Sequence, residues 1–241
     1  EASAVVQAKG ESIVKISEGA LSLEEAGELA AFDQVVGMRV VKQVLTAIAE
    51  LMRQGRPTGR GLCLVGPPGT CKTVLIVLVA QLAGYNCLKM AQVKDALVGR
   101  SEYLIRLAIS LVAACAPAIL FIDEIDKAIP GQHQGVADGG VSSDQLAQMQ
   151  QFLARDDLRH KGVFIMATSN APQNLGTALQ DRFVFLPVLG VIPDEIPDLL
   201  RSFVPRLKGK LLDNDEGLLL QAGQRLYDLG ASPRQMLDVI Q

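Results

Sequence analysis

The sequence contains few of the residues that build metal sites or disulfide frameworks, with four cysteines and two histidines among 241 residues. The cysteines at positions 63, 71, 87 and 115 have neither the paired spacing of a zinc site nor the density of a disulfide scaffold. This pattern favours reduced thiols in the cytoplasm or another reducing soluble compartment. His133 and His160 have no cysteine nearby and no acidic residues at ligand spacing, so we expect no metal site there.

Long apolar runs and a strong net charge are also absent. The longest apolar run, at 74–84, contains Gln81 and is about half as long as a bilayer span, so it predicts a buried helix and no membrane segment. The net charge of −3 is not the positive charge expected of a protein that binds a polyanion, so nucleic acid is not the favoured partner. The 49% hydrophobic and 20% charged residues are typical of a folded protein and exclude a disordered chain.

Short apolar runs alternate with longer helical patterns in the middle of the chain. The apolar runs predict buried strands at 61–65, 86–90, 118–122, 163–167 and 183–186. The helical patterns lie at 40–52, 72–83, 101–114 and 142–154, with a short turn near 175–180. This alternation predicts an α/β fold in which a parallel sheet is sandwiched by helices.

The two ends of the chain have different patterns. Residues 1–31 show no sustained period and are interpreted as an extension or linker. Only helical patterns remain after residue 192, which predicts a small all-α lid. The predicted organisation is therefore an extension at 1–31, an α/β domain at 32–188 and a lid at 189–241.

The strongest chemical signal is the run GPPGTCKT at 66–73, which follows a predicted strand and precedes a predicted helix. This order presents backbone N–H groups and the positive end of a helix to phosphates. Lys72 would reach the β- and γ-phosphates, and Thr73 would offer its hydroxyl to Mg²⁺. The run therefore predicts a P-loop that binds ATP or ADP with Mg²⁺.

Cys71 stands where this motif normally has glycine. If the backbone there needs a positive φ, a side chain costs about 1–2 kcal/mol, which would weaken nucleotide binding without abolishing it. Two interpretations are open. Either a small side chain simply fits, or a thiol beside a lysine at a helix N-terminus serves as a redox switch.

Acidic residues follow the predicted strand at 118–122. Adjacent carboxylates at the carboxyl end of a buried strand can divide the work of hydrolysis. Asp123 would hold the Mg²⁺ shell, and Glu124 would polarise a water for in-line attack on the γ-phosphate. The expected reaction is the hydrolysis of ATP to ADP and phosphate, with Thr73 and Asp123 as the metal-binding residues.

With these motifs in order, residues 32–241 resemble an AAA+ ATPase. The segment FDQVVG at 32–37 resembles the adenine-contacting segment of that family, and ATSN at 167–170 resembles sensor 1, in which Asn170 positions the attacking water. The segment ALQDRF at 178–183 resembles the arginine-finger segment, with Arg182 acting on the nucleotide of a neighbouring subunit. The segment GASPR at 230–234 resembles sensor 2, with Arg234 reading the γ-phosphate.

The motifs and the resemblance together give two sets of site residues. The nucleotide-binding candidates are Val35, Val36, Gly37, Pro67, Pro68, Gly69, Thr70, Cys71, Lys72, Thr73, Val74, Asp123, Asn170 and Arg234. The catalytic candidates are Glu124, Lys72, Asn170, Arg182 and Arg234.

The resemblance implies a ring, usually a hexamer, that uses ATP hydrolysis to remodel or unfold a macromolecular partner, most simply a protein. Ala96, Leu97, Val98 and Gly99 resemble a pore loop, with Leu97 where protein-threading relatives carry an aromatic residue. The loop at 130–141 is either a second pore loop or a mobile surface loop. The acidic strand end and the pore-loop region resemble the AAA clade, whereas sensor 2 resembles MoxR-type relatives.

Two other functions remain open at this stage. Cys71 and the segment at 230–234 are also similar to a helicase-like motor, a helicase loader or a clamp-loader-like switch that works on nucleic acid. Cys71 alone would also suit a nucleotide switch or scaffold that does not turn over.

Overall fold

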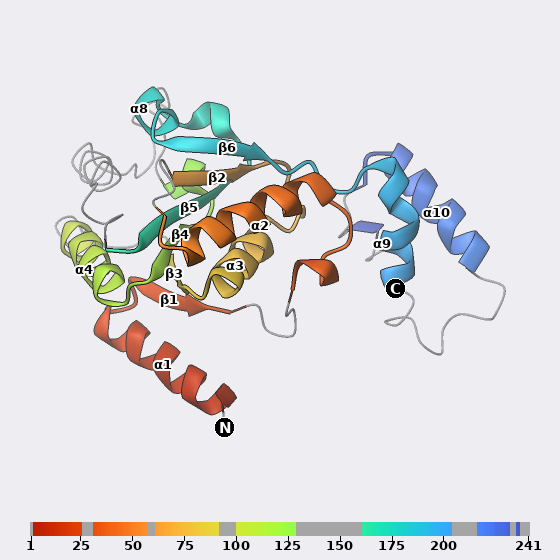
Figure 1. Cartoon of the computed structure of the whole chain (residues 1–241). Coiled ribbons are helices and arrows are strands. Elements are labelled where there is room, and N and C mark those ends of the chain that lie inside the picture. The colour runs from red at the N-terminus through yellow and green to blue at the C-terminus, as the bar shows by residue number, and fades with distance from the viewer. Residues whose placement is uncertain are drawn as a thin grey trace.

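A six-stranded sheet forms the centre of the structure, a computed structural model that describes residues 2–25, 31–56, 61–91, 100–128, 161–203, 216–231 and 235–236 (Figure 1). The strand order is β1-β3-β4-β5-β2-β6, in which every neighbouring pair is parallel except β1 and β3. The strands are β1 (Leu21–Glu24), β2 (Gly61–Val65), β3 (Asn86–Met90), β4 (Ala118–Ile122), β5 (Val163–Ser169) and β6 (Phe183–Pro187). All five predicted strands are confirmed. The additional antiparallel strand, β1, makes the sheet mixed rather than wholly parallel.

The helices fall largely where the sequence predicts them. The α-helices are α1 (Ala2–Ile16), α2 (Arg39–Arg53), α3 (Lys72–Ala83), α4 (Arg100–Ala114), α5 (Ile125–Ala128), α8 (Thr177–Gln180), α9 (Ile196–Phe203) and α10 (Glu216–Asp228). Short 3-10 turns lie at η1 (Phe32–Gln34), η2 (Pro172–Asn174) and η3 (Pro193–Glu195). The helix predicted at 142–154 lies outside the described residues.

Two apolar layers cover the two faces of the sheet. Along β4, Ile119 and Phe121 pack with α2 and α3 on one face, whereas Leu120 and Ile122 pack with α4 on the other. This alternation follows from the period of two along a strand. The apolar run of α3 is buried between α2 and the sheet, as expected for a helix that is hydrophobic on all sides. No helix within the described ranges is long and apolar enough to cross a bilayer.

The N-terminal segment contains structure that the sequence did not predict. The described part of 1–31 forms α1 and β1, and β1 pairs with β3 so that Leu21 lies opposite Met90. Leu21 is only 1% exposed, which ties this segment into the core. A strand of four residues is too short to give a recognisable period. The division of the chain at 31/32 and 188/189 stays a prediction.

Beyond β6 the described chain is helical and lies to one side of the sheet (Figure 1). Here α9 and α10 enclose a small apolar cluster of their own, which includes Ile196, Leu200 and Met236. Gly223 of α10 packs directly against the Leu200 side chain, so that a larger residue there would collide with α9.

Candidate active site

A cavity of about 530 Å³ lies where β2, β4 and β5 end. The carboxyl ends of parallel strands are the usual place for a ligand in such a sheet. The lining residues come from five segments: Gln34, Val35, Val36 and Met38; residues 68–74; Asp123 and Glu124; Thr168 and Asn170; and Gly190, Val191, Leu199 and Ser202. The structure thus brings together the predicted P-loop, the acidic strand end, Asn170 and the two valines of the adenine-contacting segment.

The P-loop between β2 and α3 is shaped by close backbone packing and by two left-handed residues. A Cβ atom at Gly66 would collide with the Val188 carbonyl, so only glycine fits there. Gly69 has φ of 81° and Cys71 has φ of 59°, immediately before the first turn of α3. The sequence predicted a strained loop if the backbone at Cys71 had a positive φ, and the structure has that conformation.

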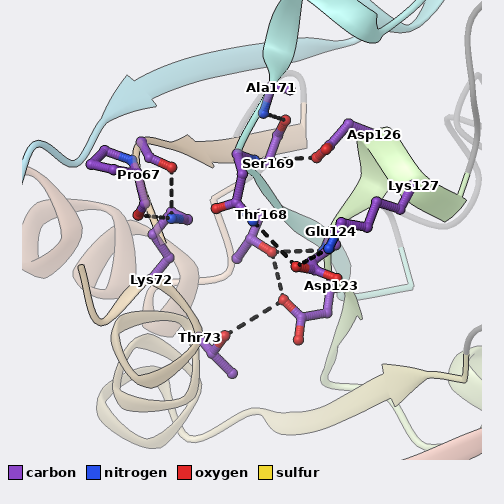
Figure 2. A network of polar contacts seen from close by, with 12 residues as sticks. Pro67, Lys72, Thr73, Asp123, Glu124, Asp126, Lys127, Thr168, Ser169 and Ala171 are labelled. Carbon is purple, nitrogen blue, oxygen red and sulfur yellow. Dashed lines mark hydrogen bonds and ion pairs between the residues drawn. The ribbon is translucent and has the colours of Figure 1, made fainter. Parts of the chain in front are cut away.

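Lys72 places a buried cation at the centre of this loop. Its Nζ donates to the Gly66 carbonyl at 2.8 Å and the Pro67 carbonyl at 2.6 Å (Figure 2). Burial lowers the pKa of Lys72, although the carboxylates of Asp123, Asp126 and Glu124 act in the opposite direction. The lysine therefore lies where phosphate oxygens could replace backbone carbonyls as its acceptors.

Asp123 presents its carboxylate to Thr73 across the cavity. Its Oδ1 accepts from the Thr168 hydroxyl at 2.6 Å and from the Thr73 hydroxyl at 3.5 Å (Figure 2). Its Oδ2 pairs with Lys89 Nζ at 2.8 Å. Burial by itself would raise the pKa of Asp123, but the hydrogen bonds from Lys89 and Thr168 outweigh it and the pKa is lowered. The ionised form of Asp123 is therefore favoured, and its carboxylate lies beside the Thr73 hydroxyl.

These donors fit Mg²⁺. Mg²⁺ in nucleotide sites takes one or two protein oxygens, and phosphates and waters complete its octahedron. A hydroxyl and a carboxylate from Thr73 and Asp123 are such a pair. Among the described residues, no group of three or more His, Cys, Asp or Glu side chains could hold a metal, so a metal cage made of protein alone is not found in that part of the chain.

Glu124 is held in a strained backbone conformation next to Asp123. It has φ of 49°, and its N–H donates to the Thr168 hydroxyl at 2.9 Å. Its Oε1 accepts from Asn170 Nδ2 at 3.2 Å and from Lys127 Nζ at 2.8 Å. Such strain persists only where the surroundings fix the residue, and it is common at active sites. The predicted catalytic pair, Glu124 and Asn170, is in direct contact.

A buried carboxylate links the segment predicted to contact adenine, at 32–37, to the start of the C-terminal helices. Glu195 is 4% exposed and accepts from the N–H groups of Met38 at 2.9 Å, Arg39 at 3.3 Å and Ile192 at 3.3 Å. Burial would raise the pKa of Glu195, but these hydrogen bonds and Arg39 lower it. Gly37, the third residue predicted in this segment, has φ of 74°, and a Cβ there would approach Glu195 Oε2 to 2.7 Å.

The other predicted residues lie elsewhere. Arg182 precedes β6 and so lies at the opposite end of the strands from the cavity, where its carbonyl accepts from Gly61 N–H. Arg234 and the predicted pore loops at 96–99 and 130–141 lie outside the described residues.

Sequence reasoning missed three polar residues that organise the site: Lys89, Thr168 and Glu195. Thr168 belongs to the ATSN run at 167–170, but the sequence of this run does not predict that Thr168 contacts Asp123. Lys89 is the charged residue of strand β3, whose neighbours Leu88 and Met90 are apolar, and this is the signal that could have drawn attention to it.

A protein-family model described as "ATPase family associated with various cellular activities (AAA)" matches residues 62–188, more than half of the chain. The chain belongs to the AAA family of ATPases. Its AAA domain is accordingly an ATPase that uses ATP or ADP with Mg²⁺. The predicted family, enzyme class and cofactors are thereby confirmed.

Several curated proteins are similar to this AAA domain. The meiotic spindle formation protein mei-1 of Caenorhabditis elegans is 32% identical over 175 residues, which cover 66% of this chain and 36% of that protein. Spastin of Homo sapiens is 31% identical over 169 residues, or 66% of this chain and 27% of spastin. The ATP-dependent zinc metalloprotease FtsH of Hahella chejuensis is 31% identical over 180 residues, or 68% and 28%. The chain therefore matches 27% to 36% of the length of these relatives.

Proposed function

We propose that the AAA domain hydrolyses Mg·ATP in the cavity and uses the reaction to remodel a protein partner. The observation that carries this proposal is the convergence of Lys72, Thr73, Asp123, Glu124 and Asn170 on one cavity from the ends of three strands. These five side chains supply a phosphate-binding cation, two metal-binding oxygens, a carboxylate and the amide that holds it.

Phosphate binding and charge neutralisation would come from the P-loop side of the cavity. Lys72 would exchange its carbonyl acceptors for β- and γ-phosphate oxygens, and the N–H groups at the start of α3 would point at the same phosphates. Thr73 and Asp123 would hold Mg²⁺, which when bound neutralises charge on the β- and γ-phosphates. Val35 and Val36 offer an apolar surface for the adenine ring.

Glu124 would activate the attacking water. Its carboxylate would accept the hydrogen bond of the attacking water and align it with the γ-phosphate. Asn170 donates to Glu124 Oε1, so it would fix the carboxylate and contact the same water. Because Lys127 binds this oxygen as well, the orientation of Glu124 depends on both donors.

Assembly into a ring would complete the site. Arg182 lies away from the cavity of its own subunit, which suits a guanidinium that acts on the nucleotide of a neighbour. Such an arginine contributes about 10³–10⁵ in rate. In this proposal the helices beyond β6 are a lid that carries Arg234, and residues 96–99 contact the partner in a central pore.

A protein is the partner that the relatives favour. One of them is an ATP-dependent metalloprotease by name and another is named for meiotic spindle formation. The acidic composition, with a net charge of −3, does not favour a polyanion. Single-stranded DNA or RNA should therefore leave the ATPase rate unchanged, whereas stimulation that disappears with salt would favour the nucleic-acid alternative.

The test is ATP hydrolysis per subunit as a function of protein concentration. We expect the specific activity to rise as subunits associate, and we expect Glu124→Gln and Arg182→Ala to abolish turnover while Glu124→Gln still binds ATP. Glu50→Gln and Arg106→Ala, on the outer surfaces of α2 and α4, are matched controls that should behave as wild type. Normal turnover in Glu124→Gln would refute its role, and activity independent of concentration would refute the trans arginine.

A further inference from the structure

Lys89 introduces a charge into a strand whose neighbouring residues are buried. Strand β3 reads Asn-Cys-Leu-Lys-Met, and its partner in register at Lys89 is Phe121 of β4. Lys89 Nζ lies 5.4 Å from the centre of the Phe121 ring, a distance that suits a cation–π contact. The side chain runs beside β4 toward the end of that strand, where it meets Asp123.

The two oxygens of Asp123 have different partners. Oδ2 receives the Lys89 ammonium at 2.8 Å, whereas Oδ1 receives the hydroxyls of Thr168 and Thr73. Oδ1 is therefore the oxygen that faces Thr73 and the P-loop. The side chains of Lys89 and Asp123 are 29% and 20% exposed, so solvent screens this pair less than it screens a surface pair.

We propose that Lys89 is a resident cation that sets the Mg²⁺ affinity of the site. Lys89 and Mg²⁺ share one carboxylate, so the ammonium neutralises part of the charge that attracts the metal and repels the metal directly. A unit charge at this range changes a divalent affinity by about tenfold even in a water-like medium. The inference rests on the proposed role of Thr73 and Asp123 as metal-binding residues.

Lys89 weakens the binding of Mg²⁺, but in the absence of Mg²⁺ it should strengthen the binding of the nucleotide. With Lys89 in place, Asp123 is neutralised and does not repel the phosphates of an incoming nucleotide. Without Lys89, an unpaired carboxylate faces those phosphates until Mg²⁺ binds. Lys89 therefore makes nucleotide binding less dependent on Mg²⁺.

The experiment measures the binding of a fluorescent ADP analogue to the full chain, first in EDTA and then across a Mg²⁺ titration. The variants are Lys89→Met and Lys89→Gln, which remove the charge, and Lys89→Arg, which keeps it. Lys89→Gln can still donate a hydrogen bond to Asp123, so it separates charge from orientation. Lys15→Met, on the exposed surface of α1, is the matched control.

For both neutral variants we expect the Mg²⁺ concentration at half-maximal effect to fall about tenfold, and the affinity in EDTA to fall as well. Lys89→Arg and Lys15→Met should stay within twofold of wild type. A midpoint in Lys89→Gln that is unchanged or higher, with a normal thermal unfolding curve, would overturn the proposal. If Mg²⁺ has no effect on wild type, the assignment of Thr73 and Asp123 fails instead, so the two failures are distinguishable.

Discussion

Replacing Glu195 with alanine tests whether a single buried carboxylate holds the start of α2 and the segment before it against the C-terminal helices. The change removes the acceptor for three backbone donors, those of Met38, Arg39 and Ile192. A buried donor left without a partner costs about 1–3 kcal/mol, and two of the three are only partly buried, so we expect a total loss of about 3–5 kcal/mol. In a chain of 241 residues this corresponds to a fall in Tm of about 10 °C.

The assay is thermal unfolding of wild type, Glu195→Ala, Glu195→Gln and Asp194→Ala. Asp194 is exposed and adjacent in sequence, so its removal controls for the loss of a negative charge. Glutamine keeps one acceptor oxygen and should lose roughly half as much stability as alanine. If Glu195→Ala lowers Tm no more than Asp194→Ala, the three hydrogen bonds do not stabilise the fold and the reasoning is refuted.

The pH dependence of the same variants gives a second check. Because the pKa of Glu195 is lowered in the fold, its contribution to stability is present above the unfolded-state pKa of about 4.5 and is lost as the pH falls through the lower folded pKa. The stability difference between wild type and Glu195→Gln should therefore be largest above pH ~5 and shrink on acidification. A difference that grows on acidification would contradict the lowered pKa.

Three further substitutions test the P-loop and the strand ends. Cys71→Gly removes the strain of φ 59° but makes the unfolded chain more flexible, so we expect a net gain of about 0.5–1 kcal/mol in unfolding free energy and tighter ADP binding. Gly66→Ala forces a Cβ atom against the Val188 carbonyl, and we expect a lower Tm and loss of ADP binding. Thr168→Val keeps the shape but removes the hydroxyl between the two acids, and it should cost about 1–3 kcal/mol and lower kcat more than ADP affinity.

Each of these has a matched control. Cys71→Ala retains the strain, so a gain equal to that of glycine would assign the effect to the thiol rather than to the backbone. Gly176→Ala meets no atom within 4 Å and should leave Tm and ADP binding unchanged. Thr46→Val, on the exposed side of α2, should not affect kcat; equal losses in Thr46→Val and Thr168→Val would contradict the proposed bridge.

The parts of the fold that were predictable are those whose signal is local in sequence. Strand β4 is a run of five apolar residues, and α3 starts directly after a recognisable phosphate loop. The missed strand, β1, is four residues long and takes its place in the sheet from its pairing with β3, which no local pattern reveals. Local patterns therefore identify the strands that are apolar runs, β6 at the other edge included, and miss the four-residue β1.

The candidate site divides in the same way. Lys72, Thr73, Asp123 and Glu124 occupy motif positions, and their proposed roles follow from the spacing. The partners of these residues depend instead on contacts between distant segments. Glu195 is 157 residues from Met38 in sequence, and Lys89 is 34 residues from Asp123. Only the folded arrangement brings these groups together, so the charges that tune the site could not be read from the sequence.

The order of the strands explains why Thr168 is central to the site. Because β5 lies between β2 and β4, the P-loop and the acids are on strands that do not pair with each other. Side chains at the end of β5 therefore lie between the two halves, beside the direct contact of Thr73 with Asp123. Thr168 and Asn170 are there: Thr168 bonds Asp123 and the Glu124 backbone, and Asn170 bonds the Glu124 side chain. A nucleotide phosphate that contacts Asn170 would thereby act on both acids through one strand end, which makes β5 the element best placed to report the state of the nucleotide to the rest of the domain.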